Sequence, residues 1–198
     1  MIISHKHKFI FIKPGKVAGT AIEIALRKSC SESDIVTPIS KYDPSCDQDA
    51  YEYYPQNNFG YCEHISLDEI KKLTPRIFDQ YCKVTIIRNP WDMVVSKWHW
   101  ECWIYSIFGK PNIKSYINMF KKLCKNKTYT FKQLNRKLNI NLIRTKISKD
   151  IEDDNFKSFA ENFPDIWTND QYFFLNGDMV IDSVIRFESL KTGFIALC

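Results

Sequence analysis

The fold is decided by residues 8–28, which read KFIFIKPGKVAGTAIEIALRK. Residues 8–13 are a short apolar, β-branched run closed by Pro14-Gly15, which is typical of a buried strand that ends in a tight turn. Residues 20–28 place apolar side chains at helical spacing, so a helix is predicted there. The stretch therefore predicts a unit made of a strand, a tight loop and a helix.

A second strand and helix follow in the same order later in the chain. Residues 82–87, CKVTII, form a continuous apolar run that predicts another buried strand. Residues 88–90, RNP, come directly after it, and a helix is predicted from residue 91 to about residue 108. The residues that share one face of this helix are Trp91, Val95, Trp98, Cys102 and Tyr105.

Weaker patterns predict the remaining elements. Residues 66–69, SLDE, form a capping-box pattern that starts a helix ending near Leu73. Residues 31–61 contain several prolines and no helical period, so a long loop is predicted whose tyrosines line a cleft or pack on the core. Other expected elements are helical parts within residues 112–150, a short helix at 155–163 and a strand at 179–187.

Strands that alternate with helices favour a parallel sheet with helices on its faces. The sequence therefore predicts an α/β fold in three layers, with a central, mostly parallel sheet, in a single domain over residues 1–198. Ligands of such sheets bind beyond the carboxyl ends of the strands. Residues 14–20 and 88–96 both occupy that position, so we expect them at one edge of the sheet.

The composition fits a folded domain that takes an anionic ligand. The net charge of +5 suits an anion but is too weak to predict nucleic-acid binding. The seven cysteines form no CxxC pair and are odd in number, which disfavours a zinc site or a disulfide framework. The sequence contains no secretory signal and no apolar run that could span a membrane, so we expect a cytoplasmic protein.

The loop after the first strand has the features of an anion-binding loop. Its turn brings small residues to the start of a helix, where backbone N–H groups and the helix dipole attract an anion. Gly19 lets the backbone approach a phosphate, the Thr20 hydroxyl can donate to it, and Lys16 adds positive charge. The loop is not a Walker A motif, because its lysine precedes the second glycine. The residues predicted to bind the anion are Lys13, Pro14, Gly15, Lys16, Val17, Ala18, Gly19, Thr20 and Ala21.

The second strand also ends in a phosphate-binding pattern. Arg88 leaves the strand with a planar guanidinium that suits bidentate contact with a phosphate. Ser96 follows about two turns into the predicted helix, where its hydroxyl can donate to the same group. A surface ion pair is the alternative for Arg88, but two such motifs at one edge favour the phosphate.

Taken together, these motifs resemble those of the sulfotransferases that use 3′-phosphoadenosine-5′-phosphosulfate (PAPS). Lys16, Gly19 and Thr20 match the phosphosulfate loop of the carbohydrate-modifying branch, which has a PKTxxTS-like sequence. Ala21 departs from the serine that is common there. Residues 88–96 resemble the segment of the family that binds the 3′-phosphate, which follows a strand with R-[DN]-P and a later serine.

A third segment adds to the resemblance. Residues 182–190, DSVIRFESL, are similar to a late D-x-V-x-R-F-E-x-L run of the same branch, where Arg186 and Glu188 would contact ligand or lock the sheet edge. Members of the branch continue further, so this chain is expected to be short at its C-terminus. The resemblance implies a P-loop-NTPase-like sulfotransferase fold, PAPS as donor, 3′,5′-ADP as product and no required metal. It also implies a hydroxyl or amine acceptor, with a carbohydrate favoured.

The resemblance assigns roles to particular residues. Lys16 would stabilise charge on the departing 5′-phosphate, while Arg88 and Ser96 hold the 3′-phosphate. His64 is the candidate base, because an imidazole titrates near neutral pH and its position resembles the K-H or E-H pair of uronosyl sulfotransferases. Glu63 is the alternative base.

Other functions stay open at this point. One is a non-catalytic nucleotide-binding protein of the same fold, and another is a divergent small-molecule kinase that would need ATP and Mg²⁺. The absence of GK[ST] counts against the kinase. Nucleic-acid binding through the lysine-rich middle of the chain is a weaker alternative. Beyond the hydroxyl or amine acceptor class that the resemblance implies, the sequence predicts neither the identity of the acceptor molecule nor the oligomeric state.

Overall fold

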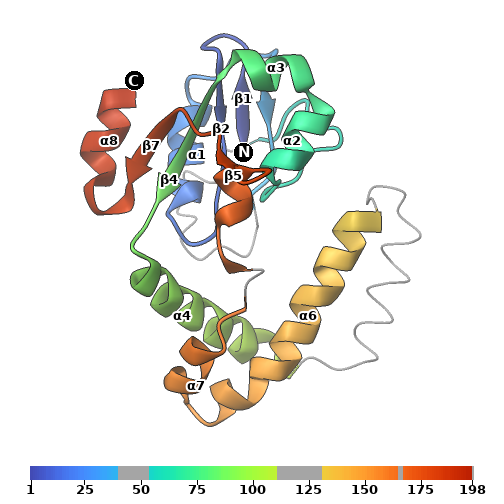
Figure 1. Cartoon of the computed structure of the whole chain (residues 1–198), viewed down its shortest axis with the longest axis vertical. Coiled ribbons are helices and arrows are strands. Elements are labelled where there is room, and N and C mark those ends of the chain that lie inside the picture. Colours follow the sequence, from blue (N-terminus) through green and yellow to red (C-terminus); the bar gives the residue numbers. More distant parts are fainter. Residues whose placement is uncertain (40–53, 111–130, 165–166, 198) are drawn as a thin grey trace. The chain divides into compact units, whose positions relative to one another are not determined.

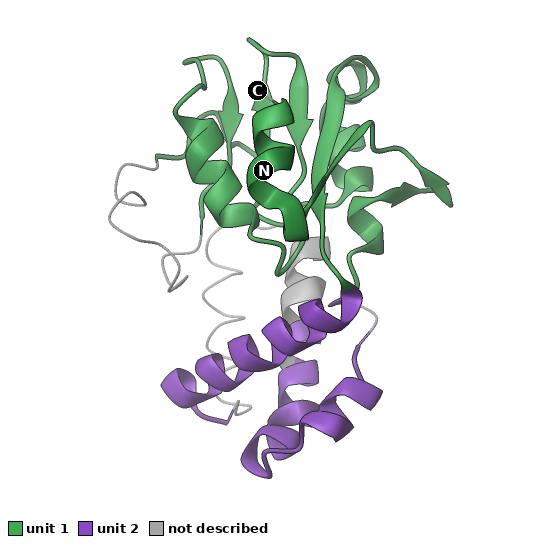
Figure 2. Ribbon diagram, turned by 90° about the vertical axis from the view of Figure 1, so that its left-hand side faces the viewer, with its two compact units in different colours: residues 1–89, 168–198 green, residues 90–167 purple. Residues whose placement is uncertain are grey.

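The computed structural model describes residues 1–39, 54–110, 131–164 and 167–197. The chain divides into a sheet unit, residues 1–89 with 168–198, and a helical unit, residues 90–167 (Figure 2). The sheet unit is an α/β structure around a five-stranded mixed sheet, and the described residues of the whole chain contain seven α-helices. The single domain over residues 1–198 stays a prediction.

The main sheet has the strand order β3-β1-β2-β4-β7. β2 pairs in parallel with β4, and β4 pairs in parallel with β7. β1 pairs antiparallel with both β2 and β3, so it runs against the other four strands and the sheet is only partly parallel. The strands are β1 (Ile2–Ser4), β2 (Phe9–Phe11), β3 (Ile35–Val36), β4 (Cys82–Ile87) and β7 (Ser183–Arg186).

Helices pack on both faces of this sheet (Figure 1). Ile2 and Phe11 point to the face covered by α1 and α8, whereas Ile3 and Ile10 point to the face covered by α2 and α3. This division follows from the two-residue period of a strand. The helices of the sheet unit are α1 (Gly19–Arg27), α2 (Leu67–Leu73), α3 (Pro75–Gln80) and α8 (Leu190–Leu197).

Strong local patterns predicted several elements correctly. β4 has the bounds that the apolar run at 82–87 predicts. α2 begins with the predicted capping box, in which the Glu69 amide donates to Ser66 Oγ (3.4 Å) and the Ser66 amide donates to Glu69 Oε2 (3.3 Å). α4 (Pro90–Phe108) begins one residue before its predicted start.

The prediction of a single strand over residues 179–187 is wrong. The structure has β6 (Asp178–Met179), paired with β5 (Phe174–Leu175) in a separate hairpin, and β7 begins only at Ser183. Asn176 and Gly177 connect β5 to β6 with φ angles of 55° and 91°, the positive values that a two-residue hairpin turn needs. This Asn-Gly pair was the sequence signal for the hairpin of β5 and β6.

Several short elements were not predicted from the sequence. β3 lies within residues 31–61, which were predicted as loop, and residues 40–53 of that stretch lie outside the described residues. β1 and α3 are also missing from the prediction, because a run of three or six residues shows too little periodicity. Of the lysine-rich stretch 112–150, the structure describes only the part from residue 131 onward.

The helical unit has an aromatic core of its own. The Trp98 and Phe159 rings meet edge to face with centroids 5.0 Å apart, and Trp167 packs against Phe159. Trp98 and Cys102 of the predicted helix face join this core, but Trp91 is 80% exposed and Val95 40% exposed. The described helices of this unit are α4, α6 (Phe131–Glu152) and α7 (Phe156–Glu161).

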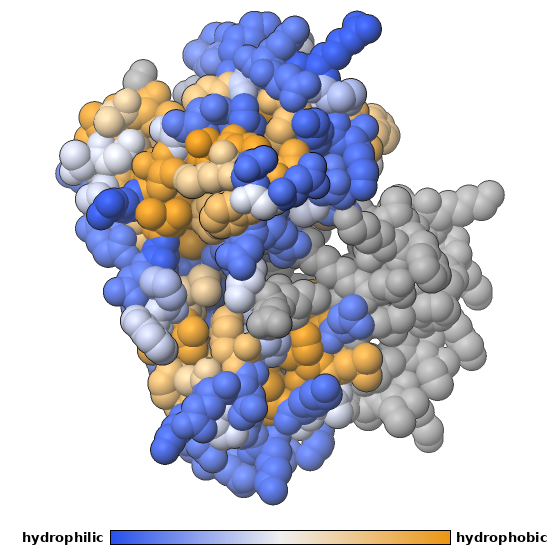
Figure 3. Space-filling view, in the orientation of Figure 1, coloured by the Kyte–Doolittle hydropathy of each residue, from blue (hydrophilic) through white to orange (hydrophobic). Residues whose placement is uncertain are grey.

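One edge of the sheet carries exposed apolar groups. On the face seen in Figure 3, apolar side chains gather over the region of β7 and α8, where Val184 and Ile195 are exposed. α8 approaches β7 closely, since a Cβ at Gly193 would lie 2.9 Å from Ile185 Cγ2.

None of the helices within the described residues combines the length and apolarity needed to cross a membrane.

Candidate anion-binding site

The loop between β2 and α1 lies where β4 also ends. The Ile12 amide donates to the Val84 carbonyl (2.8 Å), and Thr85 Oγ1 donates to the Ile12 carbonyl (3.1 Å), so β4 holds the start of the loop. α1 begins at Gly19, after Ala18 in the N-cap position. Ala18 has no side-chain oxygen to cap the helix, and the first turn carries no acidic residue. No residue of the first turn therefore offers a carboxylate to the positive end of the helix dipole.

Lys13 directs its charge into the protein interior. Its ammonium lies 2.7 Å from Glu23 Oε2 and 2.6 Å from Glu63 Oε1, and only 3% of the residue is exposed. The amino group of Met1 contacts the same Glu23 carboxylate. A buried charge costs several kcal/mol unless opposite charges surround it, so these groups depend on one another. The Lys13 side chain thus fixes the base of the loop.

Gly19 is needed because Lys13 crosses directly below it. A Cβ atom built at Gly19 would lie 2.6 Å from Lys13 Cγ, far inside van der Waals contact. The Lys13 side chain cannot easily move aside, since two carboxylates hold its far end. Besides the approach of a phosphate, which the sequence predicts, Gly19 therefore has a packing reason in the structure.

Two residues of the loop hold a left-handed backbone conformation. Lys16 and Ala18 each have a φ angle of 60°. This conformation costs about 1–2 kcal/mol for a residue with a side chain, so the surrounding contacts must stabilise it. Left-handed residues within a turn direct consecutive N–H groups toward one side, and such concave backbones bind anions. The loop geometry thus suits the predicted phosphate.

Asn169 holds the peptide groups on both sides of Gly15. The Gly15 amide donates to Asn169 Oδ1 (3.0 Å), and Asn169 Nδ2 donates to the Gly15 carbonyl (3.1 Å). The Asn169 side chain is buried against the loop. Asn169 was not predicted from the sequence, because Gly15 lies 154 positions earlier and no local pattern links the two residues.

Arg88 reaches the same loop from the end of β4. Its Nη1 donates to the Lys16 carbonyl (2.9 Å), and its guanidinium carbon lies 4.0 Å from the centroid of the Phe187 ring. The ring and the carbonyl orient the planar guanidinium at the edge of the sheet. The structure therefore brings together the two strand ends that the sequence analysis selected.

The third segment locks this edge of the sheet. Glu188 accepts a hydrogen bond from the Asn89 amide (2.7 Å), directly after Arg88. Arg186 lies opposite Ile87 in the register of β4 and β7. Of the two roles considered for Glu188, the structure shows the one that fixes the strand end.

The other predicted residues occupy different surroundings. Val17 is buried in the apolar cluster under α1, and Thr20 is largely buried in the first turn of that helix. Pro14 is buried, whereas Ala21 is exposed. Ser96 lies on α4 in the helical unit, so its predicted role beside Arg88 stays a prediction.

His64 is attached to the base of the loop. Its Nδ1 lies 3.0 Å from the Lys13 carbonyl, which can only accept, so Nδ1 carries the proton and Nε2 the lone pair. Burial and, after it, the Lys13 ammonium together lower the pKa of His64 to about 4, and the Glu63 carboxylate opposes part of this shift. His64 is therefore neutral at physiological pH. The Glu63 carboxylate accepts from Lys13, so it is committed to the interior charge pair.

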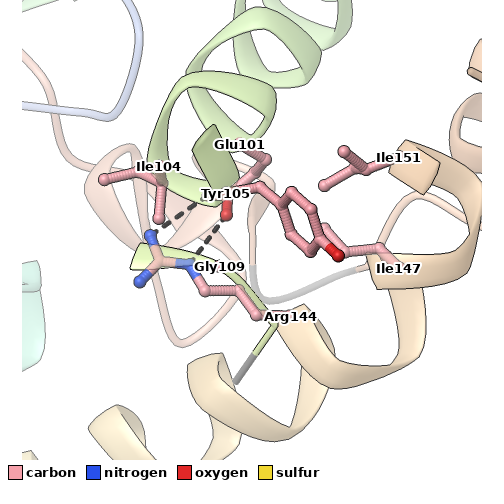
Figure 4. A pocket seen from close by; sticks show the side chains of 7 residues that line it. All are labelled: Glu101, Ile104, Tyr105, Gly109, Arg144, Ile147 and Ile151. Carbon is pink, nitrogen blue, oxygen red and sulfur yellow. Dashed lines mark hydrogen bonds and ion pairs between the residues drawn. The ribbon is translucent and has the colours of Figure 1, made fainter. Parts of the chain in front are cut away.

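The helical unit contains a hollow between α4 and α6. Figure 4 shows Arg144 directed at Glu101, its Nε 2.7 Å from Glu101 Oε2. Lys97 lies 2.8 Å from the same carboxylate. Burial alone would raise the pKa of Glu101, but these two cations outweigh it and lower that pKa. Because the charges satisfy one another, we assign the hollow a structural role. The lining residues are Glu101, Ile104, Tyr105, Gly109, Arg144, Ile147 and Ile151.

The candidate site combines a loop whose backbone geometry suits an anion with a neutral imidazole. In the part of the chain that the structure describes, no group of three or more His, Cys, Asp or Glu side chains could hold a metal ion. Comparisons with protein-family models, curated proteins and solved structures find no match to this chain. The geometry of the loop therefore carries the functional interpretation.

Gly19→Ala is expected to destabilise the protein by about 1–3 kcal/mol, because the new methyl group must displace the pinned Lys13 side chain. Urea denaturation measures this change in the free energy of unfolding. Gly15→Ala is the matched control, since its Cβ would lie 3.7 Å from Asn169 Oδ1, an ordinary contact. Equal losses of stability in the two variants would contradict the packing role of Gly19.

The His64 imidazole is expected to titrate near pH 4, well below its unfolded pKa of about 6.5. Between these values the unfolded chain binds more protons, so the contribution of His64 to stability is complete above about pH 6.5 and is lost as pH falls through about 4. NMR of the ring protons in wild type, with His64→Gln to assign the signal, measures the midpoint. A midpoint at about 6.5 would contradict the burial of the ring.

Proposed function

We propose that the chain is a PAPS-dependent sulfotransferase of P-loop-NTPase-like fold, which transfers a sulfuryl group to a hydroxyl or amine acceptor and releases 3′,5′-ADP. The observation that carries the proposal is the hydrogen bond from Arg88 to the Lys16 carbonyl. It joins the two segments whose sequences resemble those that hold the two phosphate-bearing ends of the nucleotide in this family. A carbohydrate is the acceptor that the resemblance favours.

The loop from Gly15 to Thr20 would hold the 5′ end of the donor. Its left-handed residues and the uncapped start of α1 favour an anion, and Lys16 would neutralise the charge that grows on the departing phosphate. Arg88 would hold the 3′-phosphate, with its plane set by Phe187. Ser96 would assist from α4. Ala21 offers no hydroxyl, so the backbone amides would carry more of the binding here than in sulfotransferases that have serine at this position.

His64 would act as the base rather than Glu63. It would accept the acceptor's proton at Nε2 as the acceptor oxygen or nitrogen bonds to sulfur and the bond from sulfur to the 5′-phosphate oxygen breaks. A pKa near 4 makes His64 a weak base without nucleotide, because the best catalytic pKa lies near the working pH. Negative phosphates bound nearby would raise this pKa and so strengthen the base. No step requires a metal ion.

Lys16→Ala is expected to weaken binding of 3′,5′-ADP about tenfold or more, because a charge-assisted hydrogen bond to phosphate is lost. Calorimetric titration measures the dissociation constant. Lys157→Ala on α7 is the matched control, since that side chain is 85% exposed and belongs to the helical unit. Unchanged binding in Lys16→Ala would overturn the loop assignment.

The same titration, together with an assay of sulfate transfer from PAPS, separates the alternative functions. A wild-type chain that binds ATP with Mg²⁺ in preference to 3′,5′-ADP would be a kinase. Tight binding of 3′,5′-ADP without sulfate transfer from PAPS to glycan, phenol or amine acceptors would identify a non-catalytic nucleotide-binding protein. Sulfate transfer that falls in His64→Gln while nucleotide binding persists would support the proposed base.

A further inference from the structure

The carboxamide of Asn169 pairs with Gly15 as a strand neighbour would. One side-chain acceptor and one side-chain donor meet the N–H and C=O of a single residue, at 3.0 Å and 3.1 Å. A side chain that makes both bonds fixes the orientation of the peptide groups on each side of Gly15. Asn169 is largely buried, so water competes little for these bonds.

The pairing fixes the loop where its backbone becomes strained. Lys16, the next residue, is left-handed, and its carbonyl is held by Arg88. Two consecutive residues are thus fixed by side chains from outside the loop. A left-handed residue with a side chain persists only when its surroundings determine it, and these contacts provide that constraint.

Both side chains stand next to the connections between the two units. The chain leaves the sheet unit after Asn89 and returns to it at Thr168. Arg88 precedes the first connection by one residue and Asn169 follows the second by one. The two side chains that hold the loop therefore come from the parts of the sheet unit that flank the helical unit in the sequence.

We infer that Asn169 is a positioning residue that presets the conformation in which residues 15–19 bind an anion. The inference rests on the proposed function for the identity of the ligand, a nucleotide phosphate. Asn169 acts through the Gly15 backbone and does not itself bind the ligand. Preorganisation of this kind removes the cost of ordering the loop on binding, so its loss weakens affinity.

The test compares Asn169→Ala with Asn155→Ala in the full chain. Asn155 is the matched control, because its Oδ1 accepts one backbone bond, from the Ser158 amide (3.0 Å), at the start of α7 in the helical unit. We expect Asn169→Ala to speed hydrogen exchange of the amides of residues 15–19 tenfold or more without ligand. We also expect it to weaken 3′,5′-ADP binding about tenfold. Asn155→Ala changes neither quantity, although it loses stability.

The inference is overturned if the loop amides of Asn169→Ala exchange at the wild-type rate. It is also overturned if this variant binds 3′,5′-ADP with the wild-type dissociation constant. If wild type itself does not bind 3′,5′-ADP, the proposed function fails, while the exchange rates still test the positioning role. Asn169→Asp serves if the alanine variant does not fold, since it keeps the acceptor for the Gly15 amide and loses the donor to the Gly15 carbonyl. In Asn169→Asp we expect the amides of residues 16–19 to exchange faster than in wild type, and an unchanged rate overturns the inference.

Discussion

Parallel hydrogen bonding between β2 and β4 takes the residues that follow each strand to the same edge of the sheet. Phe11 lies opposite Val84, so the loop that begins at Ile12 and the Arg88 side chain leave the sheet together. Their contact at the Lys16 carbonyl follows from this register. A shift of one residue in β4 would turn its side chains to the opposite face and separate Arg88 from the loop. The candidate site therefore depends on the pairing of two central strands and not on the loop sequence alone.

The two lysines of the loop have opposite tasks. Lys13 lies inside, between Glu23 and Glu63, and its side chain leaves room only for a glycine at position 19. Its carbonyl also holds the His64 ring in the tautomer with a lone pair on Nε2. Lys16 instead stands in the strained part of the loop, with its carbonyl held by Arg88. The buried charges around Lys13 thus shape the loop, and Lys16 is the lysine proposed to contact the anionic ligand.

Local signals allowed much of the fold to be predicted. The apolar run of β4, the capping box at Ser66 and the proline at the start of α4 each specify an element through interactions within a few residues. β1 is only three residues long, and its strand character comes from pairing with β2 and β3 rather than from its own sequence. The hairpin of β5 and β6 could also have been predicted, from the Asn-Gly pair that forms its turn.

The site was predictable in its motifs but not in its supports. Lys16, Gly19 and Arg88 stand in recognisable patterns, whereas Asn169 contributes through a partner far away in the sequence. The pairing of Lys13 with Glu23 and Glu63 could not be foreseen either, because a lysine after a strand is as compatible with a ligand as with a buried carboxylate. Long-range contacts of this kind appear only once the sheet has set the neighbours.

A crystal structure with 3′,5′-ADP bound would show whether the two strand ends hold the two phosphates of one nucleotide. We expect one phosphate within hydrogen-bond distance of the backbone amides between Gly15 and Thr20, and the other within that distance of the Arg88 guanidinium. A nucleotide bound elsewhere, or one with both phosphates remote from Arg88, would contradict this expectation.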